Sequence, residues 1–234
     1  MNLSDQQVVF VHGYGMRGFF WQTLFETWNT PKDWFAPDFN LSSVLQGREL
    51  LVEYLKARAE ESGKPSILIG HSLGGILCAL ALSKLTPSQV SHVVIVMAPW
   101  LKEKRNPLEK LIGFLIRHRL LPGALVMERF FSSTIPKEKQ QQLFNKAVQE
   151  DLDLSYEITT QTWFDPSFFV PNPSIHIIGV GSEHDRIVPS QSVEELTTAV
   201  GGSYVPAPFQ WGHDDIGIDP HSAKEFIQFL NSTL

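Results

Sequence analysis

The stretch Ile67-Leu68-Ile69-Gly70-His71-Ser72-Leu73-Gly74 decides the fold, because it joins a short apolar run to a turn in which Gly70 and Gly74 flank Ser72. The apolar run predicts a buried strand, and the Ala- and Leu-rich residues 74–85 predict a buried helix behind it. A serine on such a sharp strand-to-helix turn has a strained backbone and an exposed hydroxyl. The helix N-terminus also favours developing negative charge. The stretch therefore predicts a nucleophilic Ser72.

Apolar runs and helical patterns alternate on both sides of this turn. Buried strands are predicted at 8–11, 93–97 and 175–180, a short or edge strand at 34–39, and a weak strand at 203–205. Helices are predicted at 20–28, 45–60, 193–200 and 223–230. This alternation predicts an α/β fold with a mostly parallel sheet and helices on both faces.

The alternation breaks between residues 100 and 173. This stretch contains amphipathic helical patterns and no convincing strand, and Pro171-Asn172-Pro173 marks its end. No linker-like segment or internal repeat divides the chain. We therefore expect a single domain over residues 1–234 with a helical insertion at 100–173.

Composition restricts the class of protein. The 234 residues are 43% hydrophobic and 19% charged, as in ordinary globular domains. One cysteine, Cys78, excludes an internal disulfide framework, and the net charge of −6 argues against a nucleic-acid partner. The sequence has no motif for a metal or a nucleotide cofactor. It also has no transmembrane segment or signal peptide, so we expect a soluble, cytoplasmic protein.

The glycine-serine turn and a second motif together resemble the α/β-hydrolase superfamily. The second motif, His12-Gly13-Tyr14-Gly15, directly follows the strand predicted at 8–11. The resemblance implies that the backbone N–H groups of Tyr14 and Leu73 form an oxyanion hole. The family has two strands before the strand that carries this motif, and this chain starts almost at that strand. We therefore expect a sheet of about six strands.

The family's order of catalytic residues is serine, then acid, then histidine. Asp185 fits the acid, because it lies in a loop after the strand at 175–180 and precedes an apolar-proline pair; Glu183 is the second candidate. His213 follows the last predicted strand and fits the histidine. The resemblance implies that His213 takes the serine proton and that Asp185 orients the imidazole. His71, beside the nucleophile, is interpreted as structural.

In this family a helical insertion covers the active site as a cap, and the apolar side chains within 100–173 would suit an apolar acyl chain. Residues 101–121 carry six Lys and Arg against two Glu. This stretch could steer an acidic acyl carrier protein, although a solvated helix face is the commoner cause of such a pattern. The chain is similar in size and layout to the family's esterases that cleave pimeloyl methyl esters on a carrier protein.

The resemblance favours a serine hydrolase that cleaves carboxylic esters or thioesters of apolar acyl chains through an acyl-enzyme, without a cofactor. Its partner would be a small-molecule ester or acyl substrate. The same triad also serves carbon–carbon bond hydrolysis and cofactor-free peroxidation in relatives. Some relatives bind a ligand without turnover, so a ligand-binding protein is the alternative from a different class of function.

Overall fold

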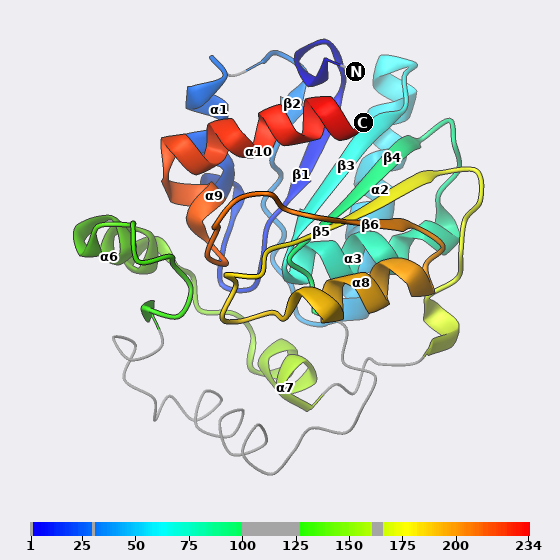
Figure 1. Cartoon of the computed structure of the whole chain (residues 1–234). Coiled ribbons are helices and arrows are strands. Elements are labelled where there is room, and N and C mark those ends of the chain that lie inside the picture. The colour runs from blue at the N-terminus through cyan, green and yellow to red at the C-terminus, as the bar shows by residue number, and fades with distance from the viewer. Residues whose placement is uncertain (1, 30, 100–126, 161–165) are drawn as a thin grey trace.

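The computed structural model describes residues 2–29, 31–99, 127–160 and 166–234, and it contains one six-stranded sheet (Figure 1). The strands are β1 (Val8–Val11), β2 (Trp34–Phe35), β3 (Ser66–His71), β4 (Val90–Val96), β5 (His176–Gly181) and β6 (Ser203–Pro206). They lie in the order β2-β1-β3-β4-β5-β6, and every neighbouring pair is parallel. The expected α/β fold with a parallel sheet of about six strands is confirmed.

The helices alternate with these strands along the chain. They are α1 (Gln22–Thr27), α2 (Val44–Ser62), α3 (Leu73–Ala81), α6 (Lys137–Lys146), α7 (Leu152–Thr160), α8 (Ser190–Ala199), α9 (Asp215–Ile218) and α10 (Pro220–Thr233). Short 3-10 turns occur at Leu3–Asp5, Gly18–Trp21, Leu82–Lys84 and Pro166–Phe168. The strand expected at 34–39 is only two residues long, in keeping with Pro37, which lacks the N–H that a longer ladder would need.

Local sequence explains where helix α2 begins and ends. The Ser43 hydroxyl accepts a hydrogen bond from the Gln46 amide at 3.1 Å, which caps the N-terminus of α2. Gly63 ends the helix in the left-handed conformation, with φ of +67°. The cap and the glycine set the length of the helix that covers one face of the sheet.

Side chains from the two faces of the sheet form two separate cores. Val9, Leu68 and Ile177 point to one face and pack with α2, α3 and α8. Phe10 and Ile69, which alternate with them along the strands, point to the other face and pack with α1, α9 and α10. Figure 1 shows these helices as layers on opposite sides of the sheet. Helices on both faces are thus confirmed, and the edge where the strands end stays available for a site.

The described residues between β4 and β5 form helices α6 and α7 and no strand. Helix α6 packs against α9 and α7 against α2, beyond the sheet edge where the strands end (Figure 1). The basic stretch 101–121 lies outside the described residues, as does 161–165. The role of residues 100–173 as a cap therefore stays a prediction.

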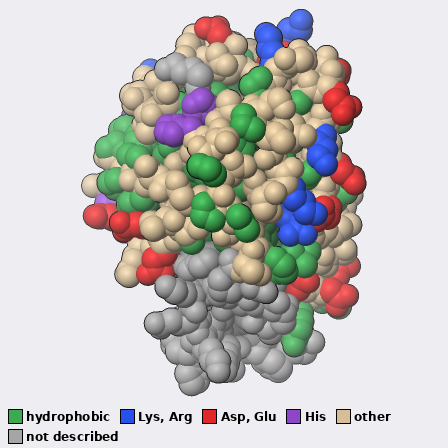
Figure 2. Space-filling model, turned by 90° about the vertical axis from the view of Figure 1, so that its right-hand side faces the viewer, with side chains coloured by type: hydrophobic (Ala, Val, Ile, Leu, Met, Phe, Trp, Pro, Cys, Tyr) green, Lys and Arg blue, Asp and Glu red, His purple; other side chains and the backbone are tan. Residues whose placement is uncertain are grey.

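Charge and hydropathy of the surface bear on possible partners. On the face drawn in Figure 2, acidic and basic side chains are mixed along one margin and do not separate into a basic patch. Within the described ranges, no helix is long and apolar enough to cross a membrane.

Candidate active site

Ser72 occupies the turn between β3 and α3 in a conformation that L-residues rarely adopt. Its φ is +52° and its ψ is −120°, and its amide donates to the Val96 carbonyl at 2.9 Å. Such a conformation costs about 1–3 kcal/mol and persists only where the surroundings enforce it. The strain predicted from the glycine-serine stretch is present in the structure.

Two glycines make this turn possible. A Cβ on Gly70 would lie 2.4 Å from the Gly74 carbonyl oxygen, and a Cβ on Gly74 would lie 2.3 Å from the Val11 carbonyl oxygen. Real Cβ atoms do not approach backbone this closely, so only glycine lets α3 start directly against the ends of β1 and β3. The close packing places Ser72 at the edge where the parallel strands end.

Asp185 and His213 meet at the same edge, in the loops that follow β5 and β6. His213 Nδ1 and Asp185 Oδ2 are 2.7 Å apart, and both side chains are buried. The other carboxylate oxygen, Oδ1, accepts the amides of Ile187 at 2.7 Å and Val188 at 3.0 Å. These bonds hold the carboxylate in one orientation. An ionised carboxylate only accepts hydrogen bonds, so His213 Nδ1 carries the proton in the bond to Asp185 Oδ2. Glu183, the second candidate for the acid, is exposed to solvent.

The surroundings of His213 alter its pKa in opposite directions. Burial lowers the pKa, whereas the charge and hydrogen bond of Asp185 and the charge of Asp214 raise it, and the net result is a raised pKa. The imidazole therefore holds a proton more readily than a histidine in water. This is the electrostatic setting that a proton-accepting base paired with a carboxylate requires.

The structure brings Ser72 and His213 to the same edge without joining them by a hydrogen bond. The Ser72 hydroxyl has no hydrogen-bond partner in the described part of the chain. His213 lies against His71, the residue before Ser72, with ring centroids 4.7 Å apart. Catalytic hydrogen bonds in free enzymes are often long and tighten when substrate binds.

The turn after β1 packs directly against Ser72. A Cβ placed on Gly13 would lie 3.2 Å from the Cβ of Ser72. His12 Nδ1–H donates to the Gly13 carbonyl at 3.0 Å, and His12 Nε2 accepts the Phe39 amide at 3.2 Å. A peptide is planar and trans, so fixing the Gly13 carbonyl also fixes the direction of the Tyr14 N–H. Burial lowers the pKa of His12, which keeps the ring neutral and able to accept at Nε2.

The amides of Tyr14 and Leu73 are the two donors expected for an oxyanion hole. Leu73 is the first residue of α3, where the amide lacks an intrahelical acceptor. Among the described residues, neither amide donates a hydrogen bond to a protein atom.

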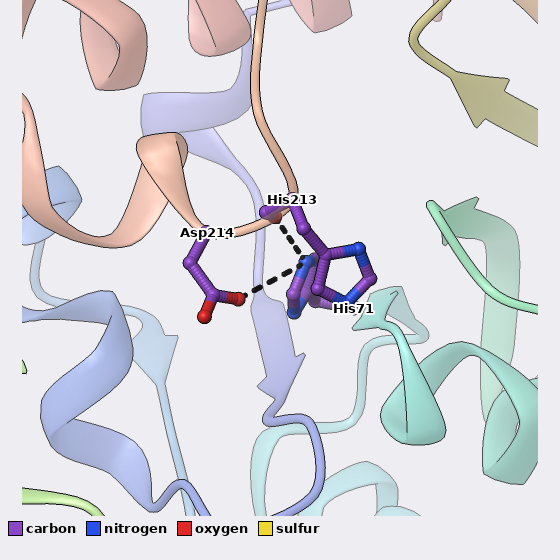
Figure 3. A group of neighbouring side chains, drawn as sticks. All are labelled: His71, His213 and Asp214. Carbon is purple, nitrogen blue, oxygen red and sulfur yellow. Dashed lines mark hydrogen bonds and ion pairs between the residues drawn. The ribbon is translucent and has the colours of Figure 1, made fainter. Parts of the chain in front are cut away.

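Asp214 is the site residue that the sequence analysis missed. Figure 3 shows His71, His213 and Asp214 together: His71 Nε2 donates to the His213 carbonyl at 2.7 Å and lies 4.0 Å from Asp214 Oδ1. Asp214 is buried, and its Oδ2 has no partner in the described ranges. Burial raises the pKa of Asp214 to about 7, against the opposing charge of His213. The only sequence signal was the run Asp214-Asp215 directly after His213.

The possible ligand atoms of these three residues lie within 4.8 Å of one another, a spacing that a metal ion could also use. In this structure, however, His71 Nε2 is bonded to a carbonyl and His213 Nδ1 to Asp185. The arrangement is that of a hydrogen-bonded cluster in which His71 supports the loop of His213. The structural role expected for His71 agrees with this geometry.

The stability of Asp214→Asn relative to wild type is expected to be greater at alkaline pH than at acidic pH. Between pH 3.8 and about 7, folded Asp214 keeps a proton that the unfolded chain releases. The free energy of unfolding therefore falls as pH rises through this window, by up to about 1.4 kcal/mol per pH unit. Asparagine does not titrate, so the variant escapes this loss.

Urea denaturation of wild type and Asp214→Asn at pH 4 and pH 8 measures the effect. The stability of the variant minus that of wild type should be larger at pH 8. An equal difference at the two pH values would show that the folded carboxyl titrates normally.

Comparison with known proteins agrees with the observed fold. The sequence model of the alpha/beta hydrolase family matches residues 8–224. A lipase-esterase related protein from Clostridium acetobutylicum superposes with a TM-score of 0.77 at 15% identity, covering 99% of this chain and 96% of that one. At this identity the likeness concerns the fold alone.

Two curated proteins match shorter stretches. Lecithin-cholesterol acyltransferase-like 1 of Arabidopsis thaliana is 43% identical over 63 residues, 25% of this chain and 14% of that protein. A Mycoplasma genitalium protein named as an esterase/lipase is 28% identical over 106 residues, 41% of this chain and 37% of that protein. The chain thus matches well under half the length of either relative. The family match, by contrast, spans nearly the whole sequence, and the chain belongs to the alpha/beta hydrolase family.

Proposed function

We propose that the protein is a serine hydrolase that cleaves carboxylic esters or thioesters through an acyl-enzyme. Ser72 is the nucleophile, His213 the general base and acid, and Asp185 the residue that orients the imidazole. The amides of Tyr14 and Leu73 stabilise the oxyanion. The observation that carries the proposal is the buried 2.7 Å bond between Asp185 and His213, at the edge where strained Ser72 lies.

The chemistry follows from these roles. Ser72 Oγ attacks the acyl carbon while His213 Nε2 takes its proton, and the carbonyl oxygen becomes an oxyanion. Collapse breaks the bond to the leaving alcohol or thiol, which receives the proton from His213. Water then attacks the acyl-serine and gives a proton to His213. The bond between the acyl carbon and Ser72 Oγ breaks, His213 returns the proton to Oγ, and the carboxylic acid is released.

An apolar acyl group suits the surface beside this site. Among the described residues, four of the five exposed large hydrophobic side chains are Tyr14, Val148, Leu152 and Tyr156. Tyr14 lies in the oxyanion turn, the Val148 amide donates to Gly15, and Leu152 and Tyr156 are one helical turn apart on α7. Exposed apolar groups gathered at one place indicate a binding surface.

We also propose that residues 100–173 act as a cap over this site. The Tyr14 hydroxyl is 2.6 Å from the Ser155 hydroxyl, and the Val148 amide donates to the Gly15 carbonyl at 2.7 Å. Both contacts join the described part of 100–173 to the turn beside Ser72. A cap in this position would select the acyl chain.

A series of p-nitrophenyl esters from acetate to decanoate tests the proposal, with wild type and Ser72→Ala measured side by side. We expect Ser72-dependent hydrolysis with an optimum at a chain longer than acetate. Equal activity of the two proteins would contradict the role of Ser72. Inert wild type would favour carbon–carbon bond hydrolysis or ligand binding without turnover.

A further inference from the structure

A buried ion pair lies directly behind the oxyanion turn. Arg17 Nη1 donates to Glu150 Oε1 at 2.6 Å and Arg17 Nη2 to Glu150 Oε2 at 3.2 Å. The two side chains are 11% and 1% exposed. Removing both charges from water costs much of what their attraction returns, so such a pair adds little net stability. Its geometry, by contrast, fixes two backbone segments relative to each other.

Glu150 also holds the turn itself. Its Oε1 accepts the Gly15 amide at 3.1 Å, while the Gly15 carbonyl accepts the Val148 amide at 2.7 Å. Arg17 Nη1 additionally donates to the Met16 carbonyl at 2.6 Å. Both polar backbone groups of Gly15 are therefore bound to residues 148–150, far away in sequence.

This hold matters because Gly15 has a φ of +72° and follows the residue that supplies the oxyanion donor. Glycine reaches this conformation without strain, yet it also leaves it easily. An oxyanion donor is effective only when it already points to the place where negative charge develops. The His12 contact to the Gly13 carbonyl holds one side of Tyr14, and the Glu150 contact to the Gly15 amide holds the other.

We propose that Glu150 positions the oxyanion hole by accepting the Gly15 amide, with Arg17 holding its carboxylate in place. The inference rests on the proposed function, because it assigns the pair to the same site. Arg17 and Glu150 themselves touch no reacting atom. The pair also makes the chain after α6 part of the machinery that orients Tyr14.

Two double variants of similar volume test the proposal. Arg17→Met/Glu150→Leu removes the acceptor for the Gly15 amide, whereas Arg17→Met/Glu150→Gln keeps a neutral acceptor there. With p-nitrophenyl butyrate, the leucine variant should lose at least about tenfold in kcat, with KM changed by no more than about twofold. The glutamine variant should stay within about threefold of wild type. Neither variant leaves an unpaired buried charge, but the leucine variant should melt below the glutamine variant because its Gly15 amide loses an acceptor, so kcat is compared at a temperature where both are folded.

Asn231→Leu is the matched control. Asn231 Oδ1 accepts the Leu3 amide at 2.8 Å, so α10 makes a similar bond to the chain before β1, away from the oxyanion turn. Its loss should lower the melting temperature and leave kcat within about twofold of wild type, since it does not touch the turn. A kcat loss equal to that of the leucine double variant would overturn the proposal.

Equal kcat values in the two folded double variants would also overturn it. If the leucine variant does not fold, Arg17→Met/Glu150→Ala removes the same acceptor without placing apolar bulk against Gly15, and the same comparison applies. Failure of the proposed function can be told apart from failure of the positioning proposal alone. If the proposed function is wrong, wild type shows no Ser72-dependent hydrolysis, and the positioning proposal then fails as well.

Discussion

Ser72→Ala is expected to lower kcat/KM for a p-nitrophenyl ester by at least roughly a thousandfold. The substitution removes the only atom that can form the acyl-enzyme in this account, Ser72 Oγ. The oxyanion donors and the binding surface remain, so a small residual rate should persist, as expected when a triad loses one member. KM should change far less than kcat, because the hydroxyl reacts and contributes little to holding the ester.

The control for this variant is its stability. Alanine keeps the Cβ and therefore the backbone strain at φ +52°, so wild type and Ser72→Ala should unfold at similar temperatures. Loss of activity together with loss of the folded state would say nothing about the nucleophile. Full activity in a folded variant would contradict the assignment of Ser72.

Asp185→Asn is expected to cost roughly 10³- to 10⁴-fold in kcat, because asparagine can favour the wrong tautomer of His213 and cannot stabilise the imidazolium. The variant should also shift the acid limb of the pH profile. Burial lowers the pKa of His213, and Asp185 contributes the charge and hydrogen bond that raise it. Without the carboxylate the pKa of His213 falls. The imidazole then stays neutral down to a lower pH than in wild type, so the residual activity extends to lower pH.

Glu183→Gln is the matched control, two residues away in the same loop. Glu183 is exposed, and its loss should leave both kcat and the acid limb unchanged. The measurement is kcat/KM from pH 5 to pH 9 for the three proteins. An acid limb unaffected by Asp185→Asn, or a large effect of Glu183→Gln, would move the acid role away from Asp185.

The sequence predicted most strands well because the sheet is parallel and buried on both faces. Such strands are nearly continuous apolar runs, and Val8–Val11 is bounded as expected. Helix boundaries were less exact, since α3 starts at Leu73 and passes into a 3-10 turn at Leu82. Helix α9 was not predicted, because four residues are too few to show a helical period.

The site residues were predictable from a motif that fixes the backbone, as for Ser72, or from a loop that follows a predicted strand, as for Asp185 and His213. The glycine-serine stretch demands one turn geometry, so the position of Ser72 followed from local sequence. The buried Asp214 and the Arg17–Glu150 pair were not predictable in this way. Each depends on segments that meet only in the folded chain, such as Gly15 with Val148, which are 133 residues apart in sequence.

The most direct test of the central claim is the site of covalent labelling by a fluorophosphonate, read by mass spectrometry of the digested protein. The account predicts one phosphonyl group per chain on the peptide that contains Ser72, and none on Ser72→Ala. It also predicts that labelling abolishes ester hydrolysis in proportion to its extent. A label on another residue, or an unlabelled protein that hydrolyses esters, would contradict the account.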